Sequence, residues 1–281
     1  MKGDNLKMST FSIICLLITG VIVGLTSGMI GVGGCFIMIP VQFWVLTSMG
    51  VPVDIGIKIA FGTNLLVVFP TAISGAYGHN KKGAVLWKQG ILLGVSGLIG
   101  SIFGATIASN LPGNILKITF GVIVILSAIR MLTAKPVKQD DEPSDKILLY
   151  ILWGFPMGIV CGMVGIGGGV VFIPIMITFL RFKMHKAVGT STALMIFTSI
   201  GGAISYMLNG LSVNGLPAYS IGYVNLLLFI LLAGTSVPMA FVGAKIAHKI
   251  PAKQLKLIFI IVMLYMGLKM TGIFTLLNLP I

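Results

Sequence analysis

Long apolar runs separated by short polar stretches make up almost the whole chain. Most runs are close to the 20 or so residues that a helix needs to cross the roughly 30 Å hydrocarbon core of a bilayer. The pattern predicts five segments in each half of the chain: Phe11–Ile30, Cys35–Thr47, Ile57–Tyr77, Gln89–Ala108, Asn114–Thr133, Lys146–Met163, Val170–Leu180, Ala187–Leu208, Tyr219–Ala244 and Gln254–Leu277. We therefore expect an all-α, polytopic membrane protein.

The second segment of each half is too short to span a membrane. At 1.5 Å per residue, Cys35–Thr47 and Val170–Leu180 reach only about 16–20 Å. Each follows a glycine-rich break, Gly31 to Gly34 in the first half and Gly165 to Gly169 in the second. These segments are predicted to be short helices that begin inside the membrane.

The two halves repeat each other. The stretch from Gly24 to Pro40 recurs from Gly158 to Pro174 with five glycines and the proline in the same places. Shorter matches follow in the same order, namely Phe61–Leu65 with Val188–Thr192, Ile73–Ala76 with Ile200–Ala203, and Gly104–Ala108 with Gly243–Ala247. We therefore divide the chain into a first transmembrane repeat (1–133), a charged cytoplasmic linker (134–146) and a second transmembrane repeat (147–281).

The placement of Lys and Arg distinguishes the topologies that these segments allow. If both glycine motifs are hairpins and the N-terminus is outside, most basic residues fall on the inside, as the positive-inside rule requires. If each motif crosses once, the bias disappears. A mixed arrangement scores slightly better but makes two near-identical motifs behave differently, so it ranks second. The favoured arrangement has an odd number of segments per half and is an inverted-topology repeat.

Composition excludes several classes of protein. Of the 281 residues, 57% are hydrophobic and 9% are charged, and the mean hydropathy is +1.08; soluble domains are about one quarter charged. The net charge of +13 fits a positive-inside signal and would also attract anions to the cytoplasmic mouth. Basic residues in short loops do not predict a nucleic-acid surface, and three cysteines without CxxC spacing predict no metal site or other cofactor.

The glycine breaks are the main candidates for a binding site. Broken backbone at membrane depth must be buried in protein or line a polar cavity. The N-terminus of the helix after each break presents N–H groups and the positive end of the helix dipole, which suit an anion. The alternative is that the glycines only allow close helix packing, and this is the favoured interpretation for isolated spacings such as Gly20 and Gly24.

Polar residues at matching places in two apolar segments are the second set of candidates. Their hydroxyl and amide groups could orient an oxyanion, or they could serve only in hydrogen bonds between helices. The predicted substrate-binding residues are Gly31, Gly33, Gly34, Cys35, Thr63, Asn64, Gly165, Gly167, Gly168, Gly169, Thr190 and Ser191. No carboxylate falls within a predicted segment, so a proton relay of the usual kind has no candidate. No nucleophile–base pair occurs either, so an enzyme is not predicted.

At these motifs the sequence resembles the TauE/SafE family of sulfite and sulfonate exporters, the toluene sulfonate uptake permease group. That family has a Gly-x-Gly-Gly-Gly-x-x-x-x-Pro motif in each half. Gly165 to Pro174 matches it fully, whereas Gly31 to Pro40 departs at Cys35, where the backbone would approach a substrate less closely. The resemblance covers nearly the whole chain and implies transport of sulfite, sulfonates, sulfoacetate or thiosulfate.

The resulting hypothesis is a multi-pass plasma-membrane carrier that moves a small sulfur-containing or organic anion by alternating access. A passive anion channel and a non-transporting membrane scaffold are the alternatives. The expected partners are the anionic substrate and the lipid bilayer, and a homodimer is left open.

Overall fold

A computed structural model describes residues 8–31, 33–133, 146–246 and 252–273. Its elements are helices α1 (Thr10–Ile30), α2 (Cys35–Ser48), α3 (Val53–Asn80), α4 (Trp87–Ser109), α5 (Gly113–Thr133), α6 (Ile147–Val164), α7 (Gly169–Thr178), α8 (Met184–Gly210), α9 (Leu226–Ile246) and α10 (Ala252–Thr271), with strands β1 (Ser220–Ile221) and β2 (Val224–Asn225). Seven of these helices, α1, α3, α4, α5, α6, α8 and α9, are long and apolar enough to cross a membrane. The prediction of an all-α polytopic membrane protein is therefore confirmed.

The predicted segments begin within a few residues of the start of an observed helix, with one exception, the segment Tyr219–Ala244. A helix was expected from Tyr219, whereas β1 and β2 first form an antiparallel hairpin and α9 begins only at Leu226. Tyr219 and Gly222 have φ of 63° and 55°, which the helical conformation excludes. Most of the predicted linker and the last residues of the tenth segment lie outside the described residues.

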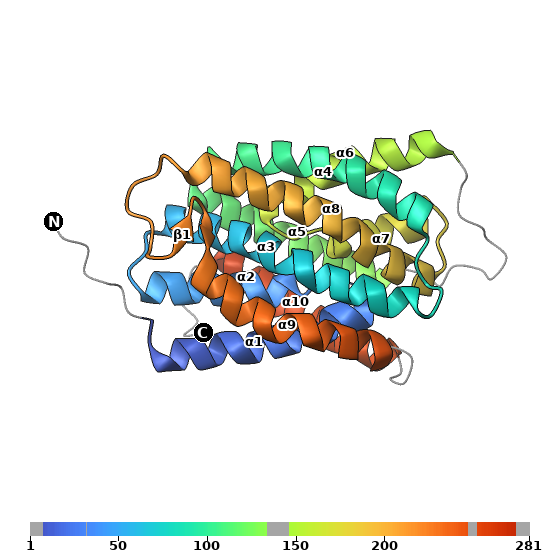
Figure 1. Ribbon diagram of the computed structural model, residues 1–281, viewed down its shortest axis with the longest axis horizontal. Coiled ribbons are helices and arrows are strands. Elements are labelled where there is room, and N and C mark those ends of the chain that lie inside the picture. Colours follow the sequence, from blue (N-terminus) through green and yellow to red (C-terminus); the bar gives the residue numbers. More distant parts are fainter. Residues whose placement is uncertain (1–7, 32, 134–145, 247–251, 274–281) are drawn as a thin grey trace.

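Both glycine motifs join helices that form hairpins. The Phe11 ring near the start of α1 meets the Trp44 ring near the end of α2, with 6.1 Å between their centres. In the second half, Trp153 of α6 stacks on Phe179, which directly follows α7, at 4.6 Å. Figure 1 shows the start of α1 and the end of α2 at the same end of the molecule. Each short helix thus returns toward the end from which its hairpin began.

The long helices pack through glycines that leave no room for a side chain. A Cβ on Gly24 of α1 would lie 2.4 Å from the carbonyl oxygen of Ser236 on α9, and one on Gly158 of α6 would lie 2.2 Å from that of Gly97 on α4. A Cβ on Gly20 would lie 2.9 Å from the carbonyl oxygen of Leu232 on α9. Because membrane helices associate without a hydrophobic driving force, such close backbone contact supplies much of their attraction.

These contacts join each half to the other. α1 of the first half packs along α9 of the second, and α6 of the second half packs along α4 of the first. Helices α3 and α8 also contact each other, as do α5 and α10. The two halves are therefore interlocked through equivalent helix pairs, which is the pattern that a two-fold relation between them would produce.

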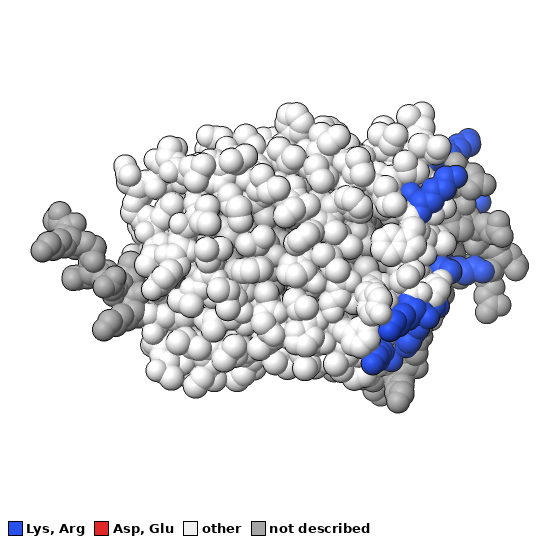
Figure 2. Space-filling view, in the orientation of Figure 1, with Lys and Arg blue, Asp and Glu red and all other residues white. Residues whose placement is uncertain are grey.

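Basic side chains gather at one end of the bundle. On the face that Figure 2 shows, the described Lys and Arg lie at the end opposite the N-terminus. The described residues at that end, in the turns and helix ends of α3–α4, α5–α6, α7–α8 and α9, are Lys81, Lys82, Lys88, Arg130, Lys146, Arg181, Lys183, Lys186 and Lys245. By the positive-inside rule this end is expected to be cytoplasmic.

Replacing Gly158 by alanine should destabilise the bundle, because the new Cβ would force α6 away from α4. Overpacking of this kind costs about 1–3 kcal/mol of the free energy of unfolding. Gly234→Ala is the matched control, since nothing lies within 4 Å of a Cβ at that helical position. Thermal unfolding of the detergent-solubilised variants measures both effects, and an unchanged transition for Gly158→Ala would contradict the close packing.

The hairpin topology predicts that residue 3 faces the outside and residue 183 the cytoplasm. In a background without Cys15, Cys35 and Cys161, a membrane-impermeant thiol reagent added to intact cells should label Gly3→Cys and leave Lys183→Cys unlabelled until the membrane is permeabilised. Protection of residue 3 would instead favour the mixed arrangement.

Candidate functional site

Each hairpin turns at a glycine break whose backbone is left-handed. The end of α1 is followed by Gly31 with φ of 70°, and α2 begins after Gly34 with φ of 58°. In the second half Gly165 and Gly168, with φ of 66° and 137°, take the same two places around α6 and α7. Glycine adopts these conformations without steric cost, which explains why both reversals are built from glycine.

Two helix N-termini lie buried inside the protein as a result. The N-cap residues of α2 and α7 are Gly34 and Gly168, so neither helix start is covered by a capping side chain. Both glycines are buried, as are Gly31, Gly33, Gly165, Gly167 and Gly169. The positive ends of the two helix dipoles therefore point into the centre of the bundle.

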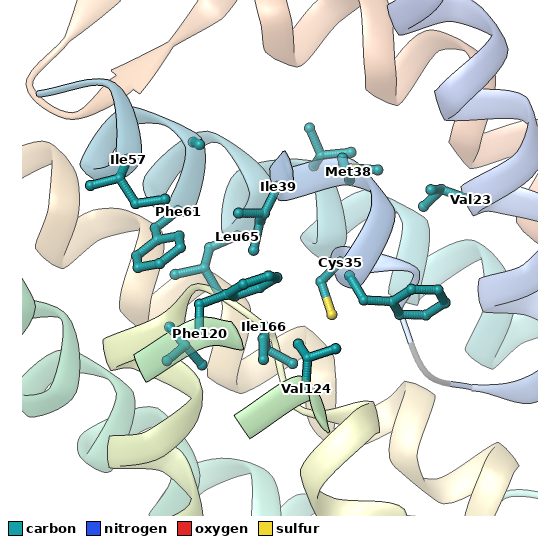
Figure 3. Packing of buried hydrophobic residues seen from close by; sticks show 14 of the residues in the cluster. Val23, Cys35, Met38, Ile39, Ile57, Phe61, Leu65, Phe120, Val124 and Ile166 are labelled. Carbon is teal, nitrogen blue, oxygen red and sulfur yellow. The ribbon is translucent and has the colours of Figure 1, made fainter. Parts of the chain in front are cut away.

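The two breaks face one another. A Cβ on Gly33 would lie 3.8 Å from the carbonyl oxygen of Ile166 in the other break, and 2.9 Å from the end of the Met195 side chain. In Figure 3 the buried Cys35 side chain, from the first turn of α2, also points toward Ile166 and toward Val124 of α5. The structure thus brings the predicted glycines of both halves, and Cys35, into one buried region.

Asn64 and Ser191 tie each break to the opposite half. Asn64 Nδ2 on α3 donates a hydrogen bond to the carbonyl oxygen of Gly165 at 2.6 Å. Ser191 Oγ on α8 donates to the carbonyl oxygen of Gly31 at 2.9 Å. Both side chains are completely buried. They hold the C-terminal ends of α6 and α1, whose last carbonyls have no partner within the helix.

Thr63 and Thr190 occupy different surroundings, although each is adjacent in sequence to one of those residues. Thr63 Oγ1 accepts the backbone N–H of Asn225 at 2.9 Å, and Thr190 Oγ1 accepts that of Leu86 at 3.0 Å. Asn225 and Leu86 directly precede α9 and α4. The two hydroxyls therefore anchor the starts of these helices, which favours interhelical hydrogen bonding for this pair.

Two further buried polar residues were missed by the sequence analysis. Thr198, two turns after Ser191 on α8, donates a hydrogen bond to the carbonyl oxygen of Gly167. Gln42, two turns after Cys35 on α2, is fully buried. A spacing of seven residues from a candidate on the same helix was the signal available for both.

Three buried atoms in the described residues have no hydrogen-bond partner, and they belong to two amides. They are Nε2 and Oε1 of Gln42 and Oδ1 of Asn64. Leaving such a group unsatisfied costs roughly 1–3 kcal/mol, so native proteins pair nearly all of them with protein, water or ligand. These amides therefore mark places where a bound molecule or water would be stabilised.

The bundle with paired, buried helix breaks is the architecture of a polytopic membrane transporter. The chain matches the Sulfite exporter TauE/SafE family over residues 16–270 and belongs to that family. It is therefore a multi-pass membrane transporter, and its family is one of transporters rather than of enzymes.

Relatives match along most of their length. A probable membrane transporter protein of Methanocaldococcus jannaschii is 34% identical over 91% of this chain and 94% of its own. One from Haemophilus influenzae is 26% identical, over 94% and 99% of the two chains. The probable membrane transporter protein YunE of Bacillus subtilis is 28% identical, over 94% and 100%. No solved structure gives a significant match.

Thr63→Val and Thr190→Val should each lower the stability of the protein. Valine keeps the shape of threonine but leaves without an acceptor a backbone N–H that is buried at Asn225 and partly buried at Leu86. Such a loss costs about 1–3 kcal/mol of unfolding free energy where the group is buried. Thr133→Val is a suitable control, because that exposed hydroxyl bonds only to carbonyls of its own helix. Thermal unfolding is the measurement, and transitions equal to that of the control would show that these hydroxyls do not anchor α4 and α9.

Proposed function

We propose that this protein is a secondary transporter that moves small sulfur-containing or organic anions, of the sulfite, sulfonate, sulfoacetate or thiosulfate class, across the plasma membrane. The observation that carries the proposal is the meeting of two glycine breaks inside the bundle, with the N-terminus of a short helix at each. Backbone N–H groups and two helix dipoles stabilise an anion there without a buried lysine.

The electrostatics of the described residues support an anionic substrate. Their one carboxylate, Asp54, lies in the first turn of α3 and accepts a hydrogen bond from the backbone N–H of Gly113, at the end opposite the basic residues. An anion at the breaks therefore meets no negative side chain among the described residues. Those basic residues would raise the local anion concentration at the cytoplasmic mouth.

The unsatisfied oxygen of Asn64, beside the second break, refines the proposed substrate class. The free Oδ1 of Asn64 is a hydrogen-bond acceptor, next to the amide nitrogen that already binds Gly165. An acceptor repels a bare oxyanion but binds a hydroxyl or amine hydrogen. This preference favours an anion that carries its own donor, such as a protonated sulfite or an aminosulfonate, over a fully deprotonated dianion.

Alternating access follows if the halves form an inverted repeat with boundaries at 1–133 and 147–281. In such transporters one repeat rocks against the other around a fixed site near the midplane. The equivalent contacts of α1 with α9 and of α6 with α4, and the crossed hydrogen bonds of Asn64 and Ser191, support this assignment. In an inverted repeat, the Asn64–Gly165 and Ser191–Gly31 hydrogen bonds would each join a long helix of one repeat to the glycine break of the other.

Transport assays distinguish the carrier from the alternatives. A carrier shows saturable uptake and counterflow in proteoliposomes, whereas a passive channel shows neither. A scaffold would transport none of the tested anions, and it would have no use for two uncovered helix starts that meet inside the bundle.

Gly33→Ala should reduce flux at least tenfold while the protein still folds. The added Cβ enters the space between the breaks, where it meets only Ile166 and the flexible end of Met195. The left-handed backbone adds a strain of about 1–2 kcal/mol. Uptake of sulfite into proteoliposomes measures the flux. Thermal shifts with sulfite, sulfate, thiosulfate, taurine and carboxylates report binding.

The matched control is Gly83→Ala, because Gly83 also has a positive φ, of 63°, but faces open space in the α3–α4 turn. The Gly83→Ala variant carries a similar backbone strain and should show the same sulfite flux as the wild-type protein. Normal flux in folded Gly33→Ala would show that the glycine break is not the substrate site.

A further inference from the structure

An aromatic pair joins α3 and α9 at the basic end of the bundle. The rings of Tyr77 and Phe241 are stacked, with 6.0 Å between their centres and 26° between their planes. Lys81 Nζ lies 4.5 Å from the centre of the Tyr77 ring, and Lys245 Nζ lies 4.3 Å from that of Phe241. Each ring therefore holds one ammonium group by a cation–π interaction.

A third lysine completes the cluster. Lys82 Nζ donates to the carbonyl oxygens of Ala244 and Lys245 at the end of α9, at 3.4 Å and 3.1 Å. Lys81 and Lys245 lie 5.8 Å and 4.3 Å from the same Phe241 ring centre, so their amines are at most about 10 Å apart, roughly the screening length in 0.1 M salt. Figure 2 shows a basic patch at its lower right, where α3 and α9 end in Figure 1.

The positive charge of this cluster is not balanced by any described carboxylate. Asp54, the one acidic residue among the described parts of the chain, is at the opposite end of α3. Ammonium groups so close together repel one another, and a bound anion would relieve the repulsion.

Side chains on the surface next to the cluster change from apolar to aromatic to basic along α3, in the same order as the regions of a bound lipid. Ile73, Tyr77 and Lys81 follow one another at intervals of four residues and so lie along one face of α3. Ile73 and Tyr77 are 45% and 54% exposed, and Lys81 is exposed at the helix end. The order is apolar, aromatic and basic toward the end of the helix, matching acyl chain, interface and headgroup in a bilayer.

The corresponding place in the second half lacks this chemistry. The sequence repeat aligns the four residues Tyr77, Lys81, Phe241 and Lys245 with Ile204, Leu208, Ile102 and Thr106. These belong to α8 and α4; Ile204, Leu208 and Ile102 are exposed and apolar, and Thr106 is exposed and uncharged. Packing of such a helix pair therefore requires neither lysines nor aromatic rings. The positive-inside rule accounts for lysines at this end, but it does not by itself place them on stacked rings.

We propose that Lys81, Lys82 and Lys245, with the stacked Tyr77 and Phe241, bind the headgroup of an anionic phospholipid in the leaflet at the basic end. The phosphate lies among the three amines, the aromatic rings sit at the level of the glycerol, and an acyl chain runs along Ile73. Because α3 and α9 belong to different halves, a lipid held here bridges the two halves at one end.

The test compares phosphatidylglycerol binding to full-length wild-type protein and to the double variant Lys81→Gln/Lys245→Gln. The phosphate is proposed to lie among three amines, so removing two of them should weaken binding at least tenfold. Native mass spectrometry in detergent measures bound lipid, and phosphatidylcholine gives the background. Lys88→Gln/Lys183→Gln removes the same charge from exposed positions at the same end and should bind like wild type.

Three outcomes would overturn the proposal: unchanged binding in the first variant, equal loss in the second, or competition by soluble glycerol phosphate at the concentration at which the lipid binds. If Lys81→Gln/Lys245→Gln does not fold, Tyr77→Ile, which introduces the residue found at position 204, provides the second test and should also weaken binding. The Lys81→Arg/Lys245→Arg variant keeps the charge and should retain the lipid.

Discussion

The absence of water from the bilayer core is the constraint on which the rest of the structure depends. Helix ends placed at membrane depth must find hydrogen-bond partners within the protein. Here the ends of α1 and α6 find them in Ser191 and Asn64, each supplied by the opposite half. The breaks can exist only because both halves are assembled, so the same bonds that make the centre stable also join the halves.

The close packing of the helices is also a consequence of the lipid environment. Lipid offers helices no hydrophobic reason to associate, so contact between backbones has to supply the attraction. Gly24 and Gly158 bring α1 onto α9 and α6 onto α4 with no side chain between them. The first helix of each half therefore packs against a helix of the other half, and this places the two glycine breaks face to face. The proposed anion site is a consequence of that arrangement.

Charge is separated along the bundle. The described basic residues gather mainly at one end, while the centre offers helix dipoles and the neutral amide of Asn64. A neutral centre of this kind can bind an anion and also release it, which a buried lysine would hinder. The proposed lipid cluster of Lys81, Lys82 and Lys245 belongs to the basic end and is separate from the central site.

The sequence by itself determined the helices, the breaks and the family, because apolar run length and recurring glycines report local constraints that a bilayer enforces on every segment. It also pointed to Asn64 and Ser191. Only the tertiary structure decided that Thr63 and Thr190 anchor α9 and α4, that Gln42 is buried without partners, and that a hairpin precedes α9. Each of these depends on which face a helix turns toward a neighbour far away in sequence, and local periodicity can suggest a shared face but does not specify that neighbour.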